Sequence, residues 1–137
     1  KTTFKMNPTI KQYIQAYENL ETSTINNLLE CIDEHFIFSD PFHTIKDKNE
    51  LKELFIKMFQ KFKNPRFKIV DIANNDKIFF IKWNFSGAYK KKFSFDGISE
   101  VRVKNNLIVS HIDYWDSGSN FYCQLPIIGQ LFRKIHE

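Results

Sequence analysis

The chain has 137 residues, of which 42% are hydrophobic and 15 are Phe, with only four Gly and four Pro. This composition indicates one folded domain with a large apolar core, and it excludes a disordered chain. The net charge of +4 comes from scattered basic residues, so a nucleic-acid partner is not indicated.

Two amphipathic helices are predicted near the N-terminus. Residues 1–5 precede Met6 and are interpreted as a vector remnant. Asn7 as N-cap and Pro8 at the first helical position open the first helix. Its apolar positions recur at helical spacing, as do those of a second, shorter helix after the polar break at 21–24. These positions are Ile10, Tyr13, Ile14 and Tyr17, then Ile25, Leu28, Leu29 and Ile32.

A short strand and a long helix follow. The stretch 35–42 is β-branched and aromatic, and Pro41 ends the strand because proline cannot donate the next ladder hydrogen bond. Asp40 is therefore expected at a strand end. Asp47 and Glu50 then form a capping-box pattern for a long amphipathic helix. The apolar stripe of that helix is Leu51, Leu54, Phe55, Met58, Phe59 and Phe62.

From residue 66 onward the hydrophobic period is two, which predicts half-buried strands. Asn74 to Asp76, Lys90 to Lys92 and Asn105-Asn106 supply the turns of a four-stranded antiparallel meander. Helices segregated from strands indicate an α+β domain. Because such long strands twist, we expect a cone-shaped, curved antiparallel sheet wrapped around the N-terminal helices, with an apolar interior.

The even positions of the strands and the C-terminal tail form further apolar surfaces. The tail, 119–137, is predicted to form an amphipathic helix that packs on the domain 7–118 or on a partner. A second apolar face of the sheet indicates a contact with another molecule. The preferred prediction is a homodimer through the outer sheet face. That face consists of Ile78, Phe80, Ile98, Ile108, Ile112 and Tyr114.

The spacing of the cysteines and the hydropathy of the chain bear on its cellular compartment and on whether it binds a metal or cofactor. Cys31 and Cys123 have neither CxxC nor metal-ligand spacing, so the sequence predicts a reduced, cytoplasmic protein with no metal and no cofactor. No apolar run approaches the ~18 residues of a membrane span, which argues against membrane association.

Three chemically distinctive residues fall on one face of the last strand. His111, Asp113 and Trp115 alternate there with outward positions. Ionisable groups inside an apolar interior are costly unless function or pairing requires them. The predicted chemistry is that Asp40 or Asp113 abstracts an acidic C–H or activates water, with His111, Ser99 or a Tyr polarising the substrate oxygen.

Each of these residues also has a structural interpretation. Asp40 before Pro is a common turn former, and His111 with Asp113 is equally consistent with a buried hydrogen-bonded pair. The predicted catalytic set is nonetheless Asp40, Asp113 and His111. The predicted substrate-binding residues are Tyr17, Leu54, Met58, Phe79, Trp83, Phe95, Ser99, Val101 and Trp115, with a small hydrophobic molecule as the expected ligand.

The stretches FSDPF and ISEVRV with IVSHIDYWD, in this order of elements, resemble the SnoaL-like and ketosteroid isomerase-like branch of the nuclear transport factor 2-like superfamily. The resemblance implies a general base at Asp40, from the Asp-Pro of ketosteroid isomerases, and a catalytic carboxylate at Asp113, from SnoaL-like cyclases. Ser99 stands where the isomerases have a protonated Asp, and their oxyanion-hole Tyr falls near Ala16.

Three classes of function remain open from the sequence. The first is a cofactor-independent isomerase, cyclase or hydrolase that uses an Asp general base on an apolar substrate. The second is a non-catalytic module that binds a hydrophobic ligand. The third is a protein-interaction domain, which the apolar outer face and tail favour.

Overall fold

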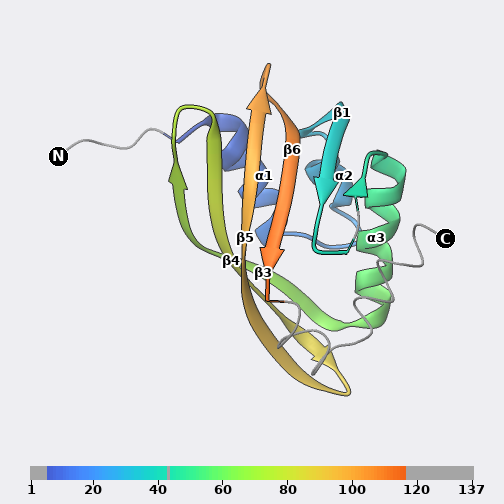
Figure 1. The fold of residues 1–137 in the computed structure, drawn as a ribbon. Helices are drawn as coiled ribbons and strands as arrows, with labels where there is room; N and C mark the ends of the chain where they lie inside the picture. Colours follow the sequence, from blue (N-terminus) through green and yellow to red (C-terminus); the bar gives the residue numbers. More distant parts are fainter. Residues whose placement is uncertain (1–5, 43, 117–137) are drawn as a thin grey trace.

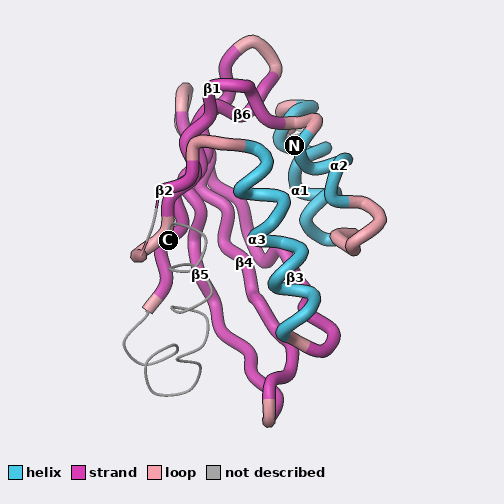
Figure 2. The backbone as a smooth tube through the Cα atoms, turned by 90° about the vertical axis from the view of Figure 1, so that its right-hand side faces the viewer, coloured by secondary structure: helices cyan, strands magenta, loops and turns pink. Residues whose placement is uncertain are grey.

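The computed structural model describes residues 6–42 and 44–116, and its helices all lie on one side of a curved sheet (Figures 1 and 2). The helices are α1 (Pro8–Glu18), α2 (Ile25–Leu29) and α3 (Lys48–Lys61). Asn7 caps α1 as predicted, because its side chain accepts hydrogen bonds from the first free backbone N–H groups. Asp47 caps α3 in the same way.

Six strands form one sheet in the order β2-β1-β6-β5-β4-β3. Their bounds are β1 (Ile32–Ser39), β2 (Thr44–Ile45), β3 (Lys63–Asn74), β4 (Ile78–Tyr89), β5 (Lys91–Lys104) and β6 (Leu107–Trp115). Strands β3 to β6 form the predicted antiparallel meander. The β5–β6 hairpin turns at Asn105-Asn106, both with positive φ, as a tight hairpin requires. The α+β class and the curved sheet are thus confirmed.

The sheet is mixed, which the sequence analysis did not predict. Strand β1 pairs in parallel with β6, so that Phe38 lies opposite His111 and Ser39 opposite Ile112. The second helix is also shorter than predicted, because Ile32 already opens β1 instead of closing α2. This parallel pairing joins the N-terminal half of the chain to the strand that carries the predicted site.

A register shift in β6 changes which of its residues face the core. Arg102 pairs with Ser110 and Val103 pairs with Ile108, which leaves Val109 as an extra residue. Ile108 is therefore buried, whereas Leu107 and Val109 are half-buried. The prediction that Ile108 belongs to the outer face is wrong for this reason.

The core lies between the helices and the concave sheet face. It combines α1 and α3 residues with the odd positions of β4 and β5, as the period of two predicts. On the outer face Phe80, Ile98 and Tyr114 are exposed. The homodimer through this face stays a prediction. Within residues 6–42 and 44–116 no helix combines the length and the apolar character that crossing a membrane takes. The predicted remnant, 1–5, and the predicted tail helix, 119–137, lie outside the described residues.

Candidate functional site

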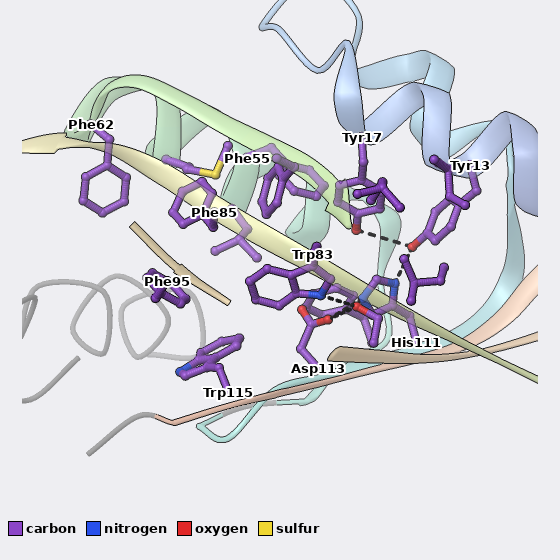
Figure 3. Close-up of a pocket in the computed structure, with 18 residues that line it drawn as sticks. Tyr13, Tyr17, Phe55, Phe62, Trp83, Phe85, Phe95, His111, Asp113 and Trp115 are labelled. Atoms are coloured by element: carbon purple, nitrogen blue, oxygen red, sulfur yellow. Dashed lines mark hydrogen bonds and ion pairs between the residues drawn. The ribbon is translucent and has the colours of Figure 1, made fainter. Parts of the chain in front are cut away.

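A cavity opens between α1, α3 and the concave face of the sheet, and its wall is almost entirely aromatic and aliphatic (Figure 3). Its empty volume is about 840 Å³ including open solvent at the mouth, and about 90 Å³ of it admits the centre of a water molecule. The lining residues are Tyr13, Ile14, Tyr17, Phe38, Leu54, Phe55, Met58, Phe62, Phe67, Ile69, Ile81, Trp83, Phe85, Phe95, Ser99, His111, Asp113 and Trp115.

Three of the predicted site residues are not among those lining residues. Val101 is fully buried behind the cavity wall, opposite His111 in the neighbouring strand, and Phe79 is half-buried against the core. Asp40 uses its Oδ1 atom to accept the backbone N–H of Phe42 at 2.7 Å. That bond is the turn-forming role that an Asp before Pro commonly takes. A catalytic role for Asp40 stays a prediction.

Asp113 holds the polar end of the cavity. Its Oδ1 atom accepts hydrogen bonds from the Ser99 hydroxyl and from His111 Nε2, the latter at 2.7 Å. Ser99 is its cross-strand neighbour on β5, so the register itself brings the two side chains together. Its Oδ2 atom has no hydrogen-bond partner in the described part of the chain, and the side chain is 14% exposed. One carboxylate oxygen is thus fixed and the other is available to a ligand.

Trp83 extends this set of bonds through its indole. Trp83 Nε1 donates to the Ser99 hydroxyl at 2.8 Å, which directs the Ser99 proton toward Asp113. Trp83 lies opposite Gly97 in the β4–β5 ladder, and its ring covers that glycine. The indole reaches Ser99 because no side chain stands at position 97.

Substituting Gly97 with alanine is expected to lower the free energy of unfolding by about 2–3 kcal/mol, as overpacking of a core does. A Cβ atom there would lie 2.3 Å from two ring carbons of Trp83, so the indole would have to move. Chemical denaturation measures the loss, and Gly87→Ala is the matched control, because its Cβ would meet the ring of Phe93 at 3.0 Å. Equal losses in the two variants would contradict this role of Gly97.

Two tyrosines of α1 continue the hydrogen bonds on the other side of His111. The Tyr13 hydroxyl lies 2.6 Å from His111 Nδ1 and 3.4 Å from the Tyr17 hydroxyl. A phenol has one proton, and the close imidazole nitrogen is a better acceptor than the Tyr17 oxygen. With Tyr13 donating to Nδ1, Nε2 carries the imidazole proton and donates it to Asp113. His111 therefore links Tyr13 to the carboxylate.

Both phenols stay protonated in the folded protein. Burial, reinforced by Tyr17, raises the pKa of Tyr13 well above its ordinary value of 10.0. Burial is also the main cause that raises the pKa of Tyr17, with a further rise from the negative charge of Asp113. Tyr17 is therefore a protonated phenol at the cavity wall, and its one proton is directed at the Tyr13 hydroxyl 3.4 Å away.

Alkaline titration should find Tyr13 and Tyr17 un-ionised until the protein unfolds. The unfolded phenols ionise above about pH 10, whereas the folded ones do not, so stability is complete below that pH and is lost as pH rises. The phenolate absorbance, recorded beside circular dichroism, should show a late step that coincides with unfolding. Tyr17→Phe should reduce that step, and Tyr114→Phe, which removes an exposed phenol, should not. A late step that precedes unfolding would contradict the assignment.

The sequence analysis missed the contacts that organise this site. It treated Tyr13 as a packing residue and Ser99 as a substrate contact, whereas Tyr13 orients His111, and Ser99 joins Trp83 to Asp113. The buried odd positions of β4 and β5 did signal that Trp83 and Ser99 face the interior. Nothing in the local pattern pairs Tyr13 with a residue 98 positions away.

The polar end of the cavity differs from a metal centre. Among the described residues, no three His, Cys, Asp or Glu side chains gather as a metal ion would require. The arrangement offers a carboxylate with one unoccupied oxygen and a neighbouring phenol that donates. A carboxylate oxygen of this kind can accept a proton, and a phenol can donate a hydrogen bond to a developing negative charge.

The sequence and the fold of the chain were compared with those of known proteins. The SnoaL-like domain family matches residues 11–111. No curated protein sequence matches the chain. Solved structures with the same fold include a ketosteroid isomerase-like protein from Catenulispora acidiphila in complex with trimethylamine, with a TM-score of 0.73 and 14% identity over 89% of this chain and 95% of that one.

Two further structures are similar to the same extent. A candidate polyketide cyclase from Xanthomonas campestris has a TM-score of 0.70 and 13% identity, covering 85% of this chain and 93% of that one. TerC, co-crystallised with polyporic acid, has a TM-score of 0.72 and 10% identity, covering 82% of this chain and 95% of that one. At these identities the likeness establishes the fold alone.

Proposed function

Because the chain belongs to the SnoaL-like domain family, we propose that it is a cofactor-independent enzyme that uses Asp113 as a general base on a small, largely apolar molecule. The observation that carries the proposal is that only one of the two oxygens of the Asp113 carboxylate is hydrogen-bonded within the described residues. Ser99 and His111 hold its Oδ1 atom, and its Oδ2 atom has no partner among the described residues inside an aromatic cavity. A base held in one orientation inside an apolar cavity is what proton abstraction needs.

The reaction class that fits best is removal of a proton from carbon beside a carbonyl group. The C–H proton passes to Asp113 Oδ2, and the electron pair moves onto the carbonyl oxygen as an enolate. The Tyr17 phenol, which lines the same cavity and stays protonated, exchanges its long 3.4 Å hydrogen bond with Tyr13 for one to that oxygen. Isomerases and cyclases share this first step, and a donor beside the base favours them over a hydrolase.

The known structures of this fold support a small-molecule role. One of them holds trimethylamine and another was co-crystallised with polyporic acid, both small organic molecules. The lining of this cavity is aromatic over most of its extent, so flat, apolar molecules are the best match.

Deuterium exchange tests the proposed step without knowledge of the natural substrate. The protein is incubated in D2O with a panel of flat, enolisable ketones such as 2-tetralone, and the loss of the acidic C–H signal is followed by NMR. We expect exchange faster than in buffer, because Asp113 is positioned and buffer bases are not. Exchange no faster than in buffer for the whole panel would contradict the proposal.

A non-catalytic ligand-binding module is the second candidate. Its support is that the Tyr13 hydroxyl is already bound to His111 and that Ser99 stands where the isomerases have a protonated Asp, which leaves one phenol as donor. Saturable binding of the same ketones without any exchange would favour this candidate over the enzyme.

A further inference from the structure

We propose that the ligand of this cavity is an apolar organic cation, an amine whose positive nitrogen lies beside Asp113 and the rings of Trp83, Phe95 and Trp115. The inference rests on the proposed function, since both use the Asp113 carboxylate inside the cavity. It adds the chemical class of the ligand, which the general-base proposal leaves open.

The first support is a carboxylate with no Lys or Arg beside it. Asp113 is the only acidic residue among the described lining residues, and none of them is Lys or Arg. The Ser99 hydroxyl and His111 Nε2 both lie at its Oδ1 atom. These two contacts leave Oδ2 as the carboxylate oxygen that a ligand can reach.

A charge in such surroundings attracts an opposite charge strongly. The wall of the cavity is apolar, so water screens the carboxylate poorly, and a neutral ligand would bring no opposite charge to Oδ2. An ammonium group would supply that charge beside the unoccupied Oδ2 atom. A cationic end with an apolar body therefore matches both the polar end and the aromatic remainder of the cavity.

The second support is a group of three aromatic rings that line the same cavity as Asp113. The rings of Trp83, Phe95 and Trp115 have centroids 6.1 to 6.5 Å apart and are mutually inclined by 60° to 71°. Figure 3 shows the Asp113 carboxylate next to the nitrogen end of the Trp83 indole, with Trp115 on the same side of the cavity. Inclined aromatic faces beside a carboxylate are the surroundings in which proteins bind alkylated ammonium groups, by cation–π attraction.

A cationic nitrogen also agrees with the proposed chemistry. An ammonium group near the reacting carbon withdraws electrons from it, which makes the C–H more acidic and the enolate easier to form. A quaternary nitrogen has no N–H to donate to Oδ2, so it can lie near Asp113 while that oxygen stays available to take the proton from carbon.

The test compares choline with 3,3-dimethylbutan-1-ol, which has the same shape without the charge. The chain has two Trp, and both line the cavity, so intrinsic tryptophan fluorescence reports directly on this site. Each probe is titrated into the protein at constant ionic strength. We expect choline to bind about tenfold or more tightly than the alcohol, as a partly desolvated cation–π contact and a carboxylate together provide.

Two variants test whether the charge of Asp113 causes the tighter binding of choline. Asp113→Asn should reduce the choline preference to near unity and leave binding of the alcohol unchanged. Asp96→Asn removes the same charge from an exposed position of the outer face and should keep the preference. Equal or tighter binding of the alcohol by the unmodified protein, or binding of neither probe, would overturn the inference without recourse to a variant.

The two proposals fail separately. A choline preference without deuterium exchange in any ketone would leave the cation inference standing and overturn general-base catalysis. Exchange in neutral ketones without a choline preference would do the reverse.

Discussion

Asp113→Asn is expected to lower the rate of ketone deuterium exchange by a factor of about 10² to 10⁴, the usual cost of losing a positioned general base. Asparagine has the size of aspartate and its Oδ1 atom can still accept hydrogen bonds from Ser99 and His111, so the site should keep its shape. The amide has no basic oxygen, however, and cannot take the proton. NMR exchange rates and the unfolding midpoint, measured on the same sample, separate lost chemistry from lost folding.

Asp40→Asn is the matched control for this prediction. The Asp40 carboxylate accepts a hydrogen bond within its own turn and is not among the cavity-lining residues, so we expect the exchange rate to change little. A large loss in Asp40→Asn with normal exchange in Asp113→Asn would move the base to Asp40, as the Asp-Pro of ketosteroid isomerases implies. Normal exchange in both variants would end the general-base proposal.

The strands were predictable because their hydrophobic period is local. In β5 the residues Phe93, Phe95, Ser99 and Val101 are buried while their neighbours are exposed or half-buried, as alternation requires. In β6 the local pattern is ambiguous at its start, because Leu107, Ile108 and Val109 are all apolar. Three consecutive apolar residues do not show which of them face the core and which face outward. The bulge at Val109 could therefore not be predicted from them.

The candidate site was predictable where the local period of one element points its residues inward. His111, Asp113 and Trp115 alternate along β6 after the bulge, and all three line the cavity. The predicted residues Tyr17, Leu54 and Met58 of the helices and Trp83, Phe95 and Ser99 of the strands also line it. The parallel pairing of β1 with β6 joins segments far apart in the chain, and local periodicity carries no information about such a partner. The same limit applies to Tyr13, whose role depends on how α1 packs across the sheet.

Asp40 shows the limit of a short motif. The Asp-Pro pair at a strand end predicts either a catalytic carboxylate or a turn former, and both use the same two residues. The backbone N–H of Phe42, two residues later, satisfies one Asp40 oxygen. The choice between the two roles depends on the backbone direction after the strand, which the motif leaves undetermined.

Trp83→Ala is expected to lower the free energy of unfolding by about 3–5 kcal/mol, the range for removing a buried aromatic side chain. Trp83 is 6% exposed, it packs over Gly97, and its ring meets Phe67, Phe95 and Trp115. The loss should exceed that of Phe80→Ala on the same strand, because Phe80 is 37% exposed on the outer face.

Trp83→Phe separates the packing of the ring from its hydrogen bond. Phenylalanine keeps most of the aromatic contacts but has no N–H for Ser99, so we expect a cost of about 1–2 kcal/mol, close to that of one buried hydrogen bond. The exchange rate should also fall in Trp83→Phe, because the indole fixes the Ser99 hydroxyl that holds Asp113. Unchanged exchange in a folded Trp83→Phe protein would mean that the indole N–H stabilises the fold and has no part in holding the base.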